Sequence, residues 1–317
     1  MTTSCTAVAP SSSANLGPGF DVFGLGLDAL EDMVKVQKMP GVSNQVSLKV
    51  SGENYTSIPV EVNANSAGIV IKKMSEDYNI LSDLEVNILK RVPAGFGMGS
   101  SAASAAAAAL AFDGLFNLNV EKQKLIEYAA EGETASAGTK HYDNVASAIL
   151  GGFVIVRTTP RLQFIPLEPP QDLVLVVAVP GINPSARKTE LARSVLPNSV
   201  SLKSVVHNVS SASTIVAGFA LKDVVLIAEG IDDVIVEPAR RFMIPGFDAV
   251  KKNALKSGSL AVTISGAGPS MISILKTEKK AQTVAESMAA GFKEENIESR
   301  IYICKPSAGA RIVSIRS

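Results

Sequence analysis

The segment that most restricts the fold lies at residues 91–112 and reads RVPAGFGMGSSAASAAAAALAF. It overlaps the end of an apolar run at 84–93, which has the composition of a strand. Its glycines allow the backbone to take a positive φ and to approach a ligand closely. The alanines that follow have the highest helix propensity. A strand, loop and helix in this order present the first N–H groups of the helix, and its positive dipole end, to an anion such as phosphate.

The serines of this segment leave the nature of the ligand open. Ser100, Ser101 and Ser104 can cap the helix, bind phosphate oxygens or coordinate Mg²⁺. No lysine follows the last glycine, so the loop is not a Walker A motif, and its G-x-G-x-G spacing differs from the dinucleotide fingerprint. A glycine-rich turn that leads into an alanine-rich packing helix explains the same residues without any ligand.

The overall composition narrows the class of protein. Hydrophobic residues make up 46% of the chain and charged residues 19%, which is enough apolar material for a sizeable core. Basic and acidic residues number 30 each, so we expect no nucleic-acid partner. The apolar run at 102–112 is far shorter than the roughly 20 residues of a membrane span. The N-terminus lacks the pattern of a secretion signal, and we expect no membrane association.

The cysteine and histidine content indicates the compartment. The sequence holds Cys5, Cys304 and two histidines, which are too few for a disulfide framework or a thiolate zinc site. We therefore expect a cytoplasmic protein. The oligomeric state cannot be read from the sequence, although a homodimer would be ordinary.

Hydrophobic periodicity predicts a mixture of strands and helices along the whole chain. The expected strands are 5–10, 32–39, 44–52, 84–93, 151–157, 172–180 and 300–306, with a hairpin at 260–276. The expected helices are 65–78, 100–113, 121–132, 186–196, 201–219, 222–230, 246–256 and 279–294. Runs of helices beside antiparallel strands favour the α+β class. The prolines between 160 and 170 indicate a linker, so we expect domains at 1–160 and 161–317.

Two further motifs accompany the glycine-serine loop. APSSSANLGPGFDVFGLGLD occupies 9–28 and ISGAGPS occupies 264–270. Together with 93–104 they fall in the order, and near the spacing, of the three signature motifs of the GHMP kinases. The first motif is similar to the form found in the homoserine kinase branch. Three more segments, 131–146, 188–197 and 237–247, extend the resemblance over most of the chain.

The resemblance implies a two-domain fold and a reaction. It implies an N-terminal nucleotide-binding domain like ribosomal S5 domain 2 and a ferredoxin-like C-terminal domain. The reaction would transfer the γ-phosphoryl group of ATP to the side-chain hydroxyl of L-homoserine, giving O-phospho-L-homoserine in threonine biosynthesis. The residues that would hold the nucleotide are Pro93, Gly95, Gly97, Gly99, Ser100, Ser101 and Ser104. Ser101 and Glu133 would hold Mg²⁺, which prefers hard oxygen ligands.

The resemblance also assigns the residues that would bind the amino-acid substrate. Asp21 would pair with the amino group, and Asn15 lies in the same loop. Arg193 and Arg240 would grip the carboxylate, because a guanidinium can bind two oxygens at once. Arg241 is adjacent in sequence, and the E-P-x-R register favours Arg240 as the residue that faces the substrate.

The remaining assignments concern the centre of the site. Thr189 lies four residues before Arg193 and would share its helix face. Gly266 would shape a second glycine loop opposite the first. Asn144 would meet the reacting hydroxyl, and Asp143 is a candidate general base, although a loose transition state can proceed without one.

Two alternatives remain compatible with these motifs. One is a GHMP kinase for another small alcohol such as mevalonate, in which Asp21 would have no amino group to bind. The other is a non-catalytic nucleotide-binding sensor with the same fold. A serine hydrolase is excluded on pattern, because the G-x-S-x-G elbow is absent.

Overall fold

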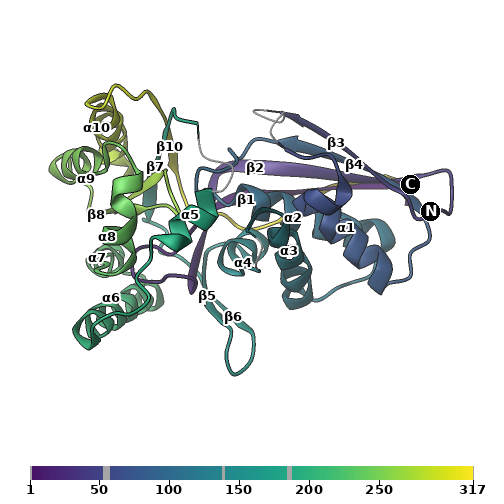
Figure 1. Cartoon of the computed structure of the whole chain (residues 1–317), viewed down its shortest axis with the longest axis horizontal. Helices are drawn as coiled ribbons and strands as arrows, with labels where there is room; N and C mark the ends of the chain where they lie inside the picture. The colour runs from purple at the N-terminus through teal and green to yellow at the C-terminus, as the bar shows by residue number, and fades with distance from the viewer. Residues whose placement is uncertain (1, 53–57, 138–139, 184–187, 317) are drawn as a thin grey trace.

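The computed structural model describes residues 2–52, 58–137, 140–183 and 188–316, and it contains two sheets, each packed against helices (Figure 1). The longer sheet is formed by β1 (Ser4–Ala14), β2 (Phe23–Met39), β3 (Val46–Gly52), β4 (Asp83–Lys90), β5 (Phe153–Arg157), β6 (Gln163–Leu167) and β11 (Arg311–Arg316). Its order is β11-β1-β2-β4-β3, and β5 pairs with the start of β2 and with β6. Its pairings are antiparallel except for β3 with β4.

Four elements cover the longer sheet: α1 (Ser66–Asp77), α2 (Ser100–Phe116), α3 (Lys122–Ala137) and α4 (Asp143–Leu150). The alanine run forms α2, and its alanine side chains are buried around the whole circumference of the helix. Side chains this small let α2 contact β1, β2, α1 and α3 closely, so the run serves packing as well as helix formation. The helix ends at Asn117, which takes the left-handed conformation that favours asparagine and glycine.

The smaller sheet has the antiparallel order β10-β7-β9-β8. Its strands are β7 (Val174–Pro180), β8 (Ala261–Ile264), β9 (Met271–Leu275) and β10 (Ser299–Cys304). The helices α9 (Phe247–Lys256) and α10 (Ala281–Lys293) bury their apolar faces against one side of it. The other side packs on α6 (Leu202–Leu221) and α7 (Val224–Glu229). The short helices α5 (Lys188–Ser194) and α8 (Val236–Arg240) complete this half, with single 3₁₀ turns at Arg241–Met243 and Glu278–Lys280. A further 3₁₀ turn, Val62–Ala64, precedes α1 in the other half.

An apolar cluster joins the two halves. Phe153 of β5 stacks on Phe219 of α6 with ring centroids 3.9 Å apart, and Phe23 meets Phe153 edge-on at 5.0 Å. Leu25 and Leu175, from the two sheets, lie in the same buried cluster. The two-domain α+β fold predicted from the motifs is therefore confirmed, with a continuous core between the halves.

Two strands were not predicted. β6 lies within the segment expected to be a linker, and β11 lies in the last residues of the chain. Pro166 belongs to β6, which is an edge strand, where a missing N–H costs no ladder hydrogen bond. Both strands follow residue 160 in sequence and hydrogen-bond into the longer sheet. The domain boundary at 160/161 stays a prediction.

The helix α6 has an unusual surface. Within the described ranges it is the one helix long and apolar enough to cross a membrane, and 17% of its apolar window is buried. Its contact with the core is made by Ile215, Gly218 and Phe219. The exposed side chains Leu202, Val206 and Val209 follow one another at helical spacing, so an apolar stripe faces outward.

Candidate active site

A cavity of about 530 Å³ lies where the two halves meet. It is bounded by the turn between β1 and β2, the loop before α2, the start of α4, the helix α5 and the turn between β8 and β9. Its lining includes the following predicted site residues: Asn15, Asp21, Gly95, Gly97, Gly99, Ser100, Ser101, Ser104, Glu133, Asp143, Asn144, Thr189, Arg193, Arg240 and Gly266. Pro93 is buried and does not line it. Motifs far apart in sequence thus meet in one place.

The glycine loop has the backbone that the sequence predicts. Gly95, Gly97 and Gly99 have φ values of 83°, 77° and 66°. A Cβ atom on Gly97 would lie 2.2 Å from the carbonyl oxygen of Ser265, and one on Gly99 would lie 2.0 Å from the hydroxyl of Ser12. Any side chain at these positions would collide with its neighbours, so the close packing requires glycine. Gly99 is also the N-cap of α2 and offers no side chain to its first N–H groups.

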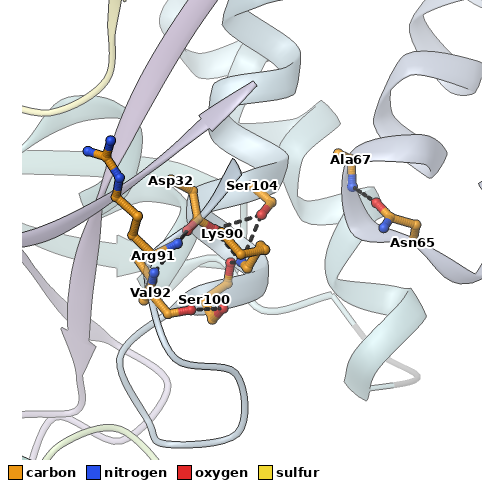
Figure 2. A network of polar contacts seen from close by, with 8 residues as sticks. All are labelled: Asp32, Asn65, Ala67, Lys90, Arg91, Val92, Ser100 and Ser104. Carbon is orange, nitrogen blue, oxygen red and sulfur yellow. Dashed lines mark hydrogen bonds and ion pairs between the residues drawn. The ribbon is translucent and has the colours of Figure 1, made fainter. Parts of the chain in front are cut away.

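A buried ion pair supports this loop from behind (Figure 2). The Lys90 ammonium contacts the carboxylate of Asp32, and the two side chains are 4% and 0% exposed. Lys90 also donates to the Ser100 carbonyl at 2.8 Å and to the Ser104 hydroxyl at 2.9 Å. This arrangement ties the end of β4 to the first turn of α2.

The second carboxylate oxygen of Asp32 holds the chain that enters the loop. It accepts hydrogen bonds from the backbone N–H groups of Arg91 and Val92 at 2.9 and 3.0 Å. The Ser104 hydroxyl donates to Asp32 at 2.7 Å, and the Ser100 hydroxyl donates to the Val92 carbonyl at 2.7 Å. Both serine hydroxyls therefore brace the loop, and their predicted role as nucleotide ligands stays a prediction.

Glu133 and Ser101 lie beside the start of α2. Burial raises the pKa of the Glu133 carboxyl to about 7, and a hydrogen bond from the Ser101 hydroxyl works against that rise. Both residues line the cavity. Among the residues described, no group of three or more His, Cys, Asp or Glu side chains forms a metal site. The pair fits a Mg²⁺ ion whose remaining ligands are phosphate oxygens and water, because Mg²⁺ usually takes one or two carboxylates from the protein.

An ion pair marks the other end of the cavity. One terminal nitrogen of Arg193, on α5, lies 2.7 and 3.0 Å from the two carboxylate oxygens of Asp21. Two guanidinium groups lie over the ring of Phe20, that of Arg193 at 5.2 Å and that of Arg240 at 5.1 Å from the ring centroid. The groups predicted to bind opposite charges of the substrate thus lie at the same end of the cavity.

The structure distinguishes the two neighbouring arginines. Arg240 is 3% exposed, lines the cavity and donates from Nε to the Ala192 carbonyl at 2.8 Å and from a terminal nitrogen to the Gly266 carbonyl at 3.4 Å. Burial, and then the charge of Arg193, lowers the pKa of Arg240 to about 10. Arg241 points outward toward Asp248, 3.5 Å away. The E-P-x-R register had favoured Arg240, and the cavity contains that arginine.

Asn15 connects the first motif to the second glycine turn. Its side-chain nitrogen donates to the Gly266 carbonyl at 2.9 Å, and its side-chain oxygen accepts from the Asp21 N–H at 3.1 Å. Asn15 and Asp21 have positive φ values of 74° and 58°, which asparagine and aspartate tolerate better than most residues. The amide therefore fixes the loop that carries the Asp21 carboxylate.

The start of α4 brings Asp143 and Asn144 to the middle of the cavity. Burial, and then the charge of Asp21, raises the pKa of Asp143 to about 6. Its carboxylate accepts from the backbone N–H of Asn144 at 2.7 Å, and the Asn144 side-chain oxygen accepts from the Ser12 hydroxyl at 2.8 Å. The nearby His141 has its pKa lowered by burial and then by Arg193. A weakly acidic carboxyl and an oriented amide thus lie side by side.

The sequence analysis missed Asn65 and Lys188, which line the cavity, and Ser12, which contacts Asn144. Ser12 does not line the cavity itself, but it orients Asn144, and its place in the first motif could have suggested this. Asn65 caps α1 through two backbone N–H groups, and an asparagine before a helical pattern is a recognisable cap. Lys188 begins α5, directly before Thr189. The sequence alone offers no signal that its side chain turns inward.

Comparisons with known proteins show which proteins this chain resembles. Residues 65–152 match the GHMP kinases N terminal domain, and residues 215–294 match the GHMP kinases C terminal family. A homoserine kinase of Haloquadratum walsbyi is 38% identical over 97% of this chain and 99% of its own length. One from Methanococcus maripaludis is 40% identical over 85% of this chain and 87% of its own.

Solved structures give the same result. The crystal structure of a homoserine kinase from Cytophaga hutchinsonii has a TM-score of 0.92 and 34% identity, and the match covers 99% of this chain and 98% of that one. The mevalonate kinase of L. major, solved with R-mevalonate, has a TM-score of 0.70 at 16% identity, with 98% and 97% covered. That second likeness shows the fold alone.

Proposed function

This chain belongs to the homoserine kinases of the GHMP kinase family, and from that premise we propose how its residues bind the two substrates and transfer the phosphoryl group. It is an ATP-dependent kinase that converts L-homoserine to O-phospho-L-homoserine, a step of threonine biosynthesis. The observation that carries the proposed site is the meeting of six separate motif segments in one cavity.

The triphosphate of ATP lies on the loop from Gly95 to Gly99 and on the first N–H groups of α2. Positive φ values and small residues bring this backbone to the cavity surface, and the helix dipole favours the negative charge. The nucleoside lies beyond Glu133, toward Asn65 and Ser66, where the lining continues between α1 and α3. Gly132 packs so closely on α1 that a Cβ there would lie 2.6 Å from the Ser66 carbonyl.

Glu133 and Ser101 would hold Mg²⁺ beside the triphosphate. When bound, this ion would neutralise charge on the β and γ phosphate oxygens and so favour departure of ADP. The buried Glu133 carboxyl has a raised pKa because its charge is costly there, and a cation offsets that cost. Isothermal titration of Mg²⁺ with the wild-type chain and with Glu133→Gln, each saturated with a non-hydrolysable ATP analogue, tests this assignment.

The substrate end binds a zwitterion. The Asp21 carboxylate accepts hydrogen bonds from the amino group of homoserine, while Arg193 and Arg240 bind the carboxylate of homoserine. The existing Asp21–Arg193 pair is partly exposed, so the charges of an amino acid can take the place of each partner at small cost. Asn15 fixes the orientation of Asp21, and Thr189 adds a hydroxyl from the same helix as Arg193.

The reaction is an in-line displacement. The side-chain oxygen of homoserine forms a bond to the γ-phosphorus, and the bond from that phosphorus to the bridging oxygen breaks, with its electron pair leaving on ADP. Asn144, held by Ser12, orients the attacking hydroxyl. The hydroxyl proton passes to the carboxylate of Asp143, whose raised pKa makes it a better acceptor than an ordinary aspartate.

The experiment that tests this site is a substrate panel. ADP release with Mg-ATP is measured for L-homoserine, D-homoserine, L-threonine, mevalonate and shikimate, and the product is identified by mass spectrometry. We expect turnover of L-homoserine. Turnover of mevalonate instead would favour the alternative alcohol kinase, and ATP binding with no turnover of any alcohol would favour the sensor.

We further propose that the protein is a cytoplasmic homodimer whose partner covers the apolar stripe of α6. Leu202, Val206 and Val209 are 78%, 61% and 59% exposed, and a two-fold axis would place each stripe against its copy. Sedimentation velocity should show a dimer that Val206→Glu with Val209→Glu converts to a monomer. A wild-type monomer, or co-sedimentation of the protein with phosphatidylcholine vesicles, would contradict this.

A further inference from the structure

Lys188 is a cation of the cavity lining to which the proposed function assigns no role. It is the first residue of α5, and it lines the cavity together with Thr189 and Arg193 of the same helix. Its ammonium group donates a hydrogen bond to the carbonyl oxygen of Gly268. The side chain therefore extends from α5 to the turn between β8 and β9.

That turn is pressed against the glycine loop that faces the triphosphate. A Cβ on Gly97 would lie 2.8 Å from the carbonyl oxygen of Gly268, the same atom that accepts from Lys188. The Ser265 hydroxyl also donates to the Gly97 carbonyl at 2.8 Å. The Lys188 ammonium thus lies at the junction of the two glycine turns, where the phosphate end of the cavity meets the substrate end.

The cations of the cavity differ in whether an acidic side chain lies near them. Arg193 is paired with Asp21, but neither Lys188 nor Arg240 has an aspartate or glutamate within 4.0 Å among the described residues. Their side-chain donors contact backbone carbonyls. Burial, and then the charge of Arg240, lowers the pKa of Lys188 to about 7.

Homoserine alone cannot neutralise the charges of both Lys188 and Arg240. Its one carboxylate neutralises the Arg240 side of the site, and its amino group brings a further positive charge to Asp21. A second anion is needed beside Lys188, and the phosphoryl group in transfer is the anion that passes through this junction. Its oxygens stay negatively charged and come nearest to Lys188 as the group passes this junction, so an ammonium there stabilises the transition state more than bound ATP.

We propose that Lys188 is a catalytic residue whose ammonium group leaves the Gly268 carbonyl to contact the oxygens of the phosphoryl group as it moves from ATP to homoserine. This role rests on the proposed arrangement of the two substrates. In this arrangement Arg240 binds the carboxylate of homoserine before the reaction, and Lys188 contacts the phosphoryl group while it is being transferred. The two cations should therefore affect different kinetic constants.

The test separates the charge of Lys188 from its hydrogen bond to Gly268. Lys188→Met removes both, Lys188→Gln keeps a donor without the charge, and Lys188→Arg keeps the charge. We expect kcat to fall by about 100- to 1,000-fold in the Met and Gln variants, with the KM values for ATP and homoserine changed by less than about threefold. Lys188→Arg should recover at least about tenfold over Met.

The controls keep the outcomes distinct. Lys252→Met, an exposed lysine of α9, should match the wild-type kcat. Thermal melts followed by circular dichroism compare the folding of all variants. If Lys188→Met does not fold, the kcat values of the Gln and Arg variants show whether the charge at this position is required. Recovery of kcat by Lys188→Gln, or a loss confined to KM, would overturn the catalytic role of Lys188 while leaving the proposed function intact. A wild-type chain that does not phosphorylate homoserine would overturn both.

Discussion

The two ends of the cavity are built from different parts of the protein. The phosphate end consists of main chain, namely the glycines at 95, 97 and 99 and the start of α2, held from behind by the buried Asp32–Lys90 pair. The substrate end consists of side chains, and its Asp21 and Arg193 are 42% and 35% exposed. Stability should therefore depend on the residues behind the phosphate loop, and recognition of the amino group on the exposed Asp21–Arg193 contact, which contributes little to stability.

Removal of Lys90 should have the largest effect on stability. Lys90→Met leaves the Asp32 carboxylate buried without its cation, and loss of one partner of such a pair costs about 3–5 kcal/mol. Urea unfolding followed by circular dichroism measures the change. Lys49→Met, which breaks the exposed pair with Glu85, is the matched control and should barely move the midpoint. Equal shifts of the unfolding midpoint in the two variants would show that the Asp32–Lys90 pair does not stabilise the phosphate end.

At the substrate end, the largest effect should follow loss of Arg240. Its buried guanidinium supplies the carboxylate contact, so Arg240→Met should lower kcat/KM for homoserine by about 100- to 1,000-fold, mainly through KM. The KM for ATP should change little, because the phosphate end is separate. Steady-state ADP release measures both constants. Arg241→Met is the control, since that side chain points toward Asp248 at the surface, and a similar loss there would reverse the assignment.

The same contrast explains what the sequence could predict. The backbone of the phosphate loop follows from local rules, because glycine in alternate positions before an alanine helix permits few other conformations. The motif segments also predicted most of the cavity lining, including Asp21, Arg193 and Arg240. The structure confirms that these residues meet, while their individual roles stay predictions.

What the sequence could not predict depends on contacts between distant segments. Asp32 and Lys90 lie 58 residues apart and read as ordinary surface charges until β2 and β4 bring them together. All side chains of β11 are exposed. A strand with no buried face does not need the alternation of apolar and polar residues by which a strand is recognised in a sequence. Lys188 turns inward because a carbonyl 80 residues away accepts its hydrogen bond. No local pattern encodes these pairings.

Asp143 should show a trade between stability and activity. The pKa of its carboxyl is raised from 3.8 to about 6, so the folded protein binds the proton more tightly than the unfolded chain does. The stabilisation that this gives is complete below pH 3.8 and is lost as the pH rises through 6. Asp143→Asn should therefore gain about 1–3 kcal/mol of stability near pH 8 and less near pH 5, while kcat falls. Urea unfolding at both pH values measures the gain, and Asp172→Asn at the surface should show none. A stability difference that does not vary with pH would refute the buried charge as its cause.

The smallest expected effect concerns Asp21, and it tests most directly whether the exposed end selects the substrate. Asp21→Asn keeps the size of the side chain but removes the charge that the amino group requires. We expect kcat/KM for L-homoserine to fall by about tenfold, because a contact this exposed to water is worth little. The value for 4-hydroxybutyrate, which lacks the amino group, should not fall, so the ratio between the two substrates narrows. If both substrates lose equally, Asp21 holds the loop through Asn15 and Arg193 and does not read the amino group.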